Sequence, residues 1–71
     1  MLSDCNYNKV RLLTDLSRIS GYLERHAKED AKKAGHVLCA NMCDEIKLDL
    51  DRHIEKLRMA VEGLAREGKF R

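Results

Sequence analysis

The stretch Gly35-His36-Val37-Leu38-Cys39-Ala40-Asn41-Met42-Cys43 holds the strongest helix breaker in the middle of the chain. It also contains two of the three cysteines and one of the three histidines. Gly35 follows a run of small and basic residues, a pattern typical of a helix that ends in a left-handed glycine. We therefore predict a bend at residues 34–36, with a helix on each side of it.

Apolar residues recur at spacings of three and four on both sides of the bend, which is the period of an amphipathic helix. Before the bend the series is Leu12, Leu16, Ile19, Leu23 and His26, widened by Leu13, Ala27, Ala31 and Ala34. After the bend the series is Cys39, Cys43, Ile46, Leu50, His53 or Ile54, Leu57, Val61 and Leu64. These series predict an all-α fold: one antiparallel helical-hairpin domain over residues 1–71, with helices over about 7–33 and about 37–67.

Two points of this architecture have an alternative. The second helix could begin at Asn41 as its N-cap, but a loop from Gly35 to Ala40 would expose much apolar surface, so we favour a start at His36 or Val37. A single helix running through Gly35 into a long coiled coil is the rival of the hairpin, and the low helix propensity of glycine disfavours it.

The composition is that of a long-helix protein, with 37% charged residues, 4% aromatic residues and no proline. The net charge is only +2, and basic and acidic residues alternate, so a nucleic-acid partner is not favoured. A nucleic-acid-binding regulator stays an alternative, and it would use Lys9, Arg11, Arg18 and Arg25 of the first helix. We expect a cytoplasmic protein with reduced thiols and no membrane contact, because three cysteines cannot all pair and no signal or membrane-spanning run is visible.

The apolar stripes are wider than a two-helix seam needs, since Leu13, Met42, Ile54 and Val61 lie beside the main positions. We therefore expect two hairpins to form a homodimeric four-helix bundle. No glycine-rich phosphate loop, nucleophile–base set or Glu-x-x-His motif is present, so we do not expect an enzyme. The function favoured is a small interaction module that acts through homodimerisation and protein–protein contacts.

One cluster of residue types points to metal chemistry. Cys39 and Cys43 are four residues apart and so share one side of a helix, as two ligands of one metal often do. With His26 and His36 they would form a Cys2His2 set suited to zinc, or a thiolate-rich set for copper(I), and would make the protein a metal-responsive regulator. The alternative is that both cysteines act as small apolar residues beside the bend, with no cofactor.

The run Leu16-Ser17-Arg18-Ile19-Ser20-Gly21 resembles the early helix of the copper-sensing repressors, an all-helical, oligomeric, DNA-binding family. The resemblance covers about six residues. That family carries a His-x-x-x-Cys pattern late in its second helix, whereas the corresponding spacing here is Cys39-x-x-x-Cys43, early in the helix. The resemblance therefore transfers no ligand residue, and we assign no family from it.

Overall fold

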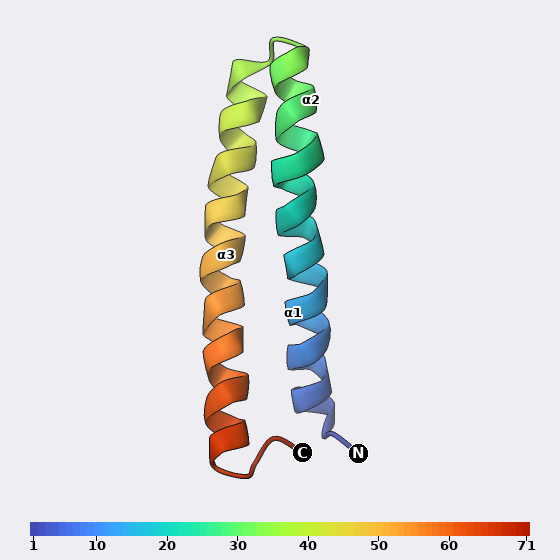
Figure 1. The fold of residues 1–71 in the computed structure, drawn as a ribbon, viewed down its shortest axis with the longest axis vertical. Coiled ribbons are helices and arrows are strands. Elements are labelled where there is room, and N and C mark those ends of the chain that lie inside the picture. The colour runs from blue at the N-terminus through green and yellow to red at the C-terminus, as the bar shows by residue number, and fades with distance from the viewer.

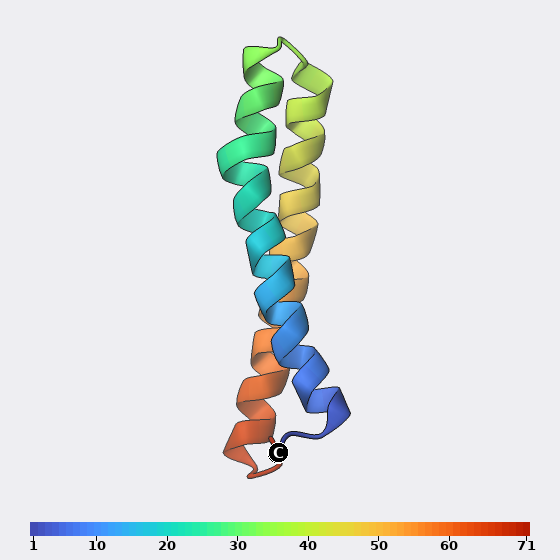
Figure 2. The ribbon, with the colours of Figure 1, turned by 90° about the vertical axis from the view of Figure 1, so that its right-hand side faces the viewer.

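The computed structural model describes all residues, 1–71, and every regular element in it is helical. The first helical arm consists of α1 (Asp4–Tyr22), one π-helical turn η1 (Leu23–Ala27) and α2 (Lys28–Lys33), and the second arm is α3 (Val37–Arg66). The arms run antiparallel and side by side along a molecule of 50 × 18 × 14 Å (Figure 1). They also wind around each other along the length of the rod (Figure 2). The prediction of an all-α fold is confirmed.

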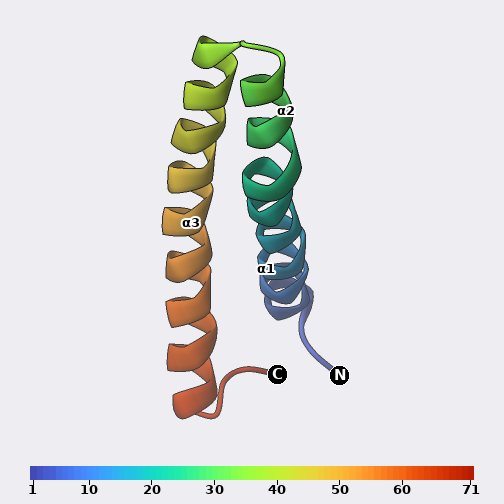
Figure 3. The same ribbon diagram turned by 45° about the horizontal axis from the view of Figure 1, so that its top comes forward.

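The first arm begins at Asp4, earlier than the sequence predicts, because Ser3 caps it. The Ser3 hydroxyl accepts a hydrogen bond from the Asn6 backbone N–H at 3.2 Å, which satisfies a donor that every helix start leaves free. The buried Asn6 side chain donates from Nδ2 to the carbonyl oxygens of Lys69 (3.2 Å) and Arg71 (3.1 Å). These bonds hold the C-terminal tail beneath α1, so both termini lie at the end of the rod opposite the bend (Figure 3).

The bend depends on the backbone of Gly35, whose φ of 75° is in the left-handed region that favours glycine. The Gly35 N–H donates to the Lys32 carbonyl at 3.0 Å, and the His36 N–H donates to the Ala31 carbonyl at 2.8 Å. Together these two bonds form the Schellman motif that satisfies the last carbonyls of a helix. The chain then turns directly into α3.

The second arm starts at the position that the sequence favours. His36 is its N-cap, without a side-chain cap bond, and Asn41 lies inside α3. The arm ends at Arg66, and Gly68, with φ of 70°, follows it in the left-handed conformation. Gly35 and Gly68 thus both adopt the left-handed backbone conformation for which glycine is suited.

The arms pack along a seam whose residues recur at spacings of three and four. On the first arm the buried or half-buried seam residues are Leu13, Leu16, Ser20, Leu23, Ala27 and Ala31. On α3 they are Ala40, Cys43, Lys47, Leu50, Ile54, Leu57, Val61 and Leu64. This seam is the only long contact between the two arms.

Some residues of the predicted apolar series lie outside the seam. They are exposed, and each immediately precedes a true seam residue: Leu12, Ile19, His26, Cys39, Ile46 and His53. Small residues such as Ser20, Ala27 and Ala40 occupy the seam instead, where they let the two backbones approach closely. A seam between two helices takes only about two residues in every seven. The series that contains Leu12 and Ile19 and the neighbouring series that contains Leu13 and Ser20 could therefore not both lie in the seam.

The π-helical turn η1 shifts the register of the first arm. The Lys28 N–H donates to the Leu23 carbonyl, five residues back, so the turn takes up one extra residue. Without the π-helical turn, the alternating spacings of three and four that continue from Leu23 and Ala27 would place Asp30 in the seam. With it, Ala31 packs in the seam and Asp30 stays exposed to water.

The hairpin buries little of its own surface. Its accessible surface is 5479 Å², whereas a compact monomer of the same mass exposes about 4,500 Å². Its radius of gyration is 15.6 Å, against about 11 Å for a compact chain of this length. Only Asn6, Ser20 and Ala40 are buried, and none of them is a large apolar residue. No helix of the structure is long and apolar enough to cross a membrane.

Candidate interaction surfaces

The groove between the arms has two long sides, and polar bonds join the arms across one of them. The Ser20 hydroxyl donates to Asp51 Oδ1 at 2.6 Å. The Lys47 ammonium donates to Asp51 Oδ2 at 2.6 Å and lies 3.5 Å from a carboxylate oxygen of Glu24. Two residues of each arm thus form one network, which fixes how far one helix can slide along the other.

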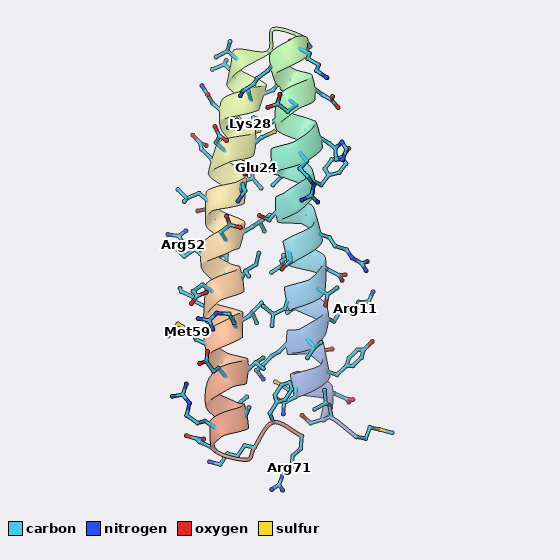
Figure 4. All side chains as sticks on the ribbon, viewed as in Figure 1. Arg11, Glu24, Lys28, Arg52, Met59 and Arg71 are labelled. Atoms are coloured by element: carbon cyan, nitrogen blue, oxygen red, sulfur yellow. The ribbon has the colours of Figure 1, made fainter.

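A further ion pair lies closer to the bend, where Lys28 Nζ is 2.8 Å from Asp44 Oδ1. Glu24 and Lys28 both lie over the groove on the side that faces the viewer in Figure 4. We call this side, defined by Ser20, Glu24, Lys28, Asp44, Lys47 and Asp51, the bridged side.

Hydrogen bonding keeps the groups of the bridged side ionised. The bond from Lys47, and then that from Ser20, lowers the pKa of Asp51. The bond to Asp51 raises the pKa of Lys47, and the bond to Asp44 raises the pKa of Lys28. Each charge is therefore paired, and no buried side-chain nitrogen or oxygen of the chain lacks a hydrogen-bond partner.

The opposite long side is apolar and carries no such bonds. Leu12 is 47% exposed, Ile19 48%, Ile46 42% and Met42 55%, and no side-chain hydrogen bond or ion pair joins the arms beside them. We call the surface formed by Leu12, Ile19, Met42 and Ile46 the open face.

Helix geometry explains why the open face and the bridged side are opposite. Ile19 and Ile46 immediately precede the seam residues Ser20 and Lys47, whereas Asp51 immediately follows a seam residue. Because the arms are antiparallel, residues that precede the first of two seam residues spaced by three fall on the same side of the hairpin from both arms. Residues that follow the second of the two fall on the other side.

Two cysteines extend the open face toward its ends. Cys5 is seven residues before Leu12, and Cys39 is seven residues before Ile46, so each continues one apolar series. Both thiols are exposed, one near the chain termini and one near the bend. The Cys5 sulfur also accepts a hydrogen bond from Lys9 Nζ at 3.0 Å.

The structure distributes the four predicted metal ligands over different surfaces. His26 is exposed, with its ring 5.4 Å from that of Tyr22, and His36 caps α3 at the bend. Cys39 is exposed and Cys43 is half-buried in the seam. No three His, Cys, Asp or Glu side chains of the chain converge as a metal site would require. Metal binding by these residues stays a prediction, and it would need side chains to move or a second chain to contribute.

Arginines line the outer surface of the first arm at seven-residue intervals, at positions 11, 18 and 25. Arg11 pairs with Asp15 at 3.2 Å, but neither Arg18 nor Arg25 has a carboxylate partner. The Arg25 guanidinium lies over the backbone of Gly21, where an added Cβ would be 2.7 Å from it. Lys9, the remaining residue of the predicted nucleic-acid surface, is half-buried instead.

The arginines of α3 are all paired within their own helix. Arg58 contacts both Glu55 and Glu62 at 2.7 Å or less, and Arg66 contacts Glu62 at 3.1 Å. These contacts raise the pKa of Arg58 and lower that of Glu55. The ion pairs surround a shallow depression over Gly63 and leave no free charge there for a ligand.

The bridged side was not predicted from the sequence. A signal was present, because Ser20 and Lys47 are polar residues at positions of a seven-residue series that is otherwise mostly apolar. Polar residues at single seam positions often fix the register of packed helices.

The chain matches no protein-family model, no curated protein and no solved structure. Its function therefore has to be argued from its own surfaces.

Proposed function

We propose that this chain is a small, non-enzymatic helical interaction module that acts by homodimerisation and by contacts with other proteins. The observation that supports the proposal is the surface that the hairpin leaves uncovered. It exposes roughly 1,000 Å² more than a compact monomer, which exceeds the ~800 Å² that each partner contributes to a standard protein–protein interface.

Pairing of two hairpins into a four-helix bundle would cover this surface. Four helices around one axis bury the faces that two helices leave at the edge of their seam. The surfaces on the outside of such a bundle would remain free for other proteins.

Size-exclusion chromatography with light scattering tests the proposal on the wild-type chain. We expect twice the chain mass, 16.4 kDa from the 8.2 kDa of one chain, at micromolar concentration. A well-folded species of single-chain mass, with a full helical circular dichroism spectrum, would refute homodimerisation.

The unpaired guanidiniums of the first arm favour a second candidate, a small regulator that binds nucleic acid. Arg18 and Arg25 lie seven residues apart on one exposed surface, with the exposed ring of Tyr22 between them, and such sets bind phosphates and stack bases. A gel shift that weakens with salt would support this candidate.

Two matched double variants distinguish the effect of where the arginines lie from the effect of net charge. Arg18→Gln with Arg25→Gln should abolish the shift, whereas Arg52→Gln with Arg66→Gln removes the same charge from the paired arginines of α3 and should preserve it. Equal losses in both variants would indicate attraction by net charge alone.

A further inference from the structure

We propose that the tail formed by residues 67–71 is a latch, which Asn6 locks across the end of the rod opposite the bend. The bend joins the two arms covalently at one end only. At the other end, Asn6 of α1 bonds to the tail that follows α3, so the latch keeps the free ends of the arms together. The latch is independent of homodimerisation, since every contact that forms it lies within one chain.

Backbone geometry brings the tail back toward α1. Gly68, with φ of 70°, turns the chain at the end of α3, and the Lys69 N–H donates to the Leu64 carbonyl at 2.8 Å. The Arg71 N–H then donates to the Lys69 carbonyl at 3.0 Å, which closes a second tight turn. The tail therefore crosses beneath α1 instead of continuing along the axis of α3 (Figure 1).

The side-chain amide of Asn6 is the group that holds the tail in this position. Asn6 is only 6% exposed, and its Nδ2 donates to the carbonyl oxygens of both Lys69 (3.2 Å) and Arg71 (3.1 Å). Its Oδ1 accepts from Lys9 Nζ at 3.1 Å, which fixes the orientation of the amide. Asparagine is the shortest side chain that carries two N–H donors on one atom, so it can hold two carbonyl groups at once.

The tail also contributes an apolar side chain to the latch. Phe70 is half-buried, whereas Lys69 and Arg71 on either side of it are exposed. The two charged side chains thus remain in water while the aromatic ring is partly removed from it. Partial burial of the ring adds hydrophobic stabilisation to that of the two hydrogen bonds.

The latch is weak enough to open while the rest of the hairpin stays folded. Each hydrogen bond makes a modest net contribution, and segments with few buried contacts open at a lower free energy than the whole chain. A partner that binds residues 67–71 in another conformation has to break both bonds to Asn6. Its binding would therefore shift the population toward open chains and release the ends of the arms.

The first experiment replaces Asn6 by a side chain of the same size that cannot donate. In Asn6→Asp, a carboxylate would face the carbonyl oxygens of Lys69 and Arg71, so the latch should open. Asn6 is the third residue of α1, where a negative charge favours the helix dipole and can still pair with Lys9. Local helix chemistry alone therefore predicts no loss of order from this change.

Residue-resolved amide hydrogen exchange by NMR measures the opening in the full-length chain. The amides of Lys69 and Arg71 should exchange about 10-fold faster or more, because two hydrogen bonds of ordinary strength are lost. The amides of residues 64–66 should also exchange faster, whereas the amide of His36 at the bend should keep its rate. The matched control is Asn8→Asp, the same change at an exposed position of α1, which should leave all these rates within about two-fold of wild type.

Three results of this experiment would overturn the latch. Unchanged exchange of the tail in Asn6→Asp would show that the amide does not hold it. Equal acceleration in Asn8→Asp would assign the effect to charge alone. Faster exchange confined to residues 69–71 would show a tail that moves without releasing the end of α3.

The second experiment needs no change at Asn6 and reads the latch from the opposite arm. The side-chain NH2 protons of Asn6 should exchange more slowly than those of the exposed Asn8 in the wild-type chain, and several-fold faster in Phe70→Ala than in wild type. Circular dichroism checks that each variant is helical, and Phe70→Ala replaces Asn6→Asp if the latter does not fold. Wild-type exchange as fast at Asn6 as at Asn8, or no acceleration in Phe70→Ala, would overturn the latch.

Discussion

The bridged side and the open face flank the same seam and use opposite chemistry. Across the bridged side, Lys47 joins Glu24 to Asp51, and Asp51 accepts from Ser20. On the open face, Ile19 and Ile46 remain about half exposed with no bond between the arms. The polar bonds fix the relative position of two helices that share little buried apolar area, and the apolar residues remain available for another surface.

This difference indicates how so thin a hairpin can favour one alignment of its two helices over others. Surface ion pairs contribute little to stability, but unpaired charges at a helix contact disfavour wrong registers. We interpret the bridged side as the device that aligns the arms, and the seam leucines as the source of most of the burial.

The largest effect should come from the seam that both sides share. Leu57→Ala should lower the free energy of unfolding by about 2 kcal/mol, the low end for a leucine that is only half-buried. Leu12→Ala on the open face should cost less than about 0.5 kcal/mol in the dissociated chain. Urea denaturation at high and low protein concentration measures both. Equal losses of unfolding free energy at low protein concentration would contradict the placing of Leu57 in the seam and of Leu12 on the open face.

The bend connects the two arms and holds them side by side. Changing its backbone should cause the next largest loss of stability. Gly35→Ala should cost about 1–2 kcal/mol, because alanine is strained at a φ of 75°. The control is Gly63→Ala in the last turn of α3, where an added Cβ would meet nothing within 4 Å, so stability should rise by roughly 0.5 kcal/mol. Thermal unfolding should give opposite shifts in Tm, and shifts of the same sign would contradict the assigned backbone conformations.

Making the bridged side apolar should erase the difference between the two sides. The combined change Ser20→Ala, Lys47→Met and Asp51→Leu removes the network, and since partly exposed ion pairs contribute little, stability should stay nearly unchanged. The chain would then have two apolar faces, so light scattering should show assemblies larger than a dimer. A clean dimer would indicate that the polar network does not direct association.

The smallest effect should be the acid sensitivity of the bridged side. The pKa of Asp51 is lower in the folded chain than the usual value near 3.9, so its contribution is present above that value and is lost as pH falls through the folded pKa. Asp51→Asn should unfold at slightly lower temperature at pH 7 and should lose less stability than wild type below about pH 4. Parallel pH profiles of Tm for the two proteins would contradict this role of Asp51.

Local chemistry made the helix ends predictable. Gly35 and Gly68 end their helices because a residue without Cβ can adopt positive φ, and this depends only on the residue itself. The cap at Ser3 was one of several candidates near the N-terminus, so the first helix start was predicted a few residues late. The proposed metal cluster was harder to judge, because a spacing of four says that Cys39 and Cys43 share a side but not what that side faces.

Apolar periodicity and glycine positions are enough to predict that the chain is helical and where each helix ends, since both act through local backbone geometry. The packing of the two arms sets the rotation of each helix about its own axis. It put Ser20, rather than Ile19, in the seam, and Ala31, rather than Asp30, after the π-helical turn. The two adjacent apolar series are nearly equivalent along one helix. They differ only when a second helix packs against one of them, because close approach favours small residues and polar pairs such as Ser20 and Asp51 form across the arms.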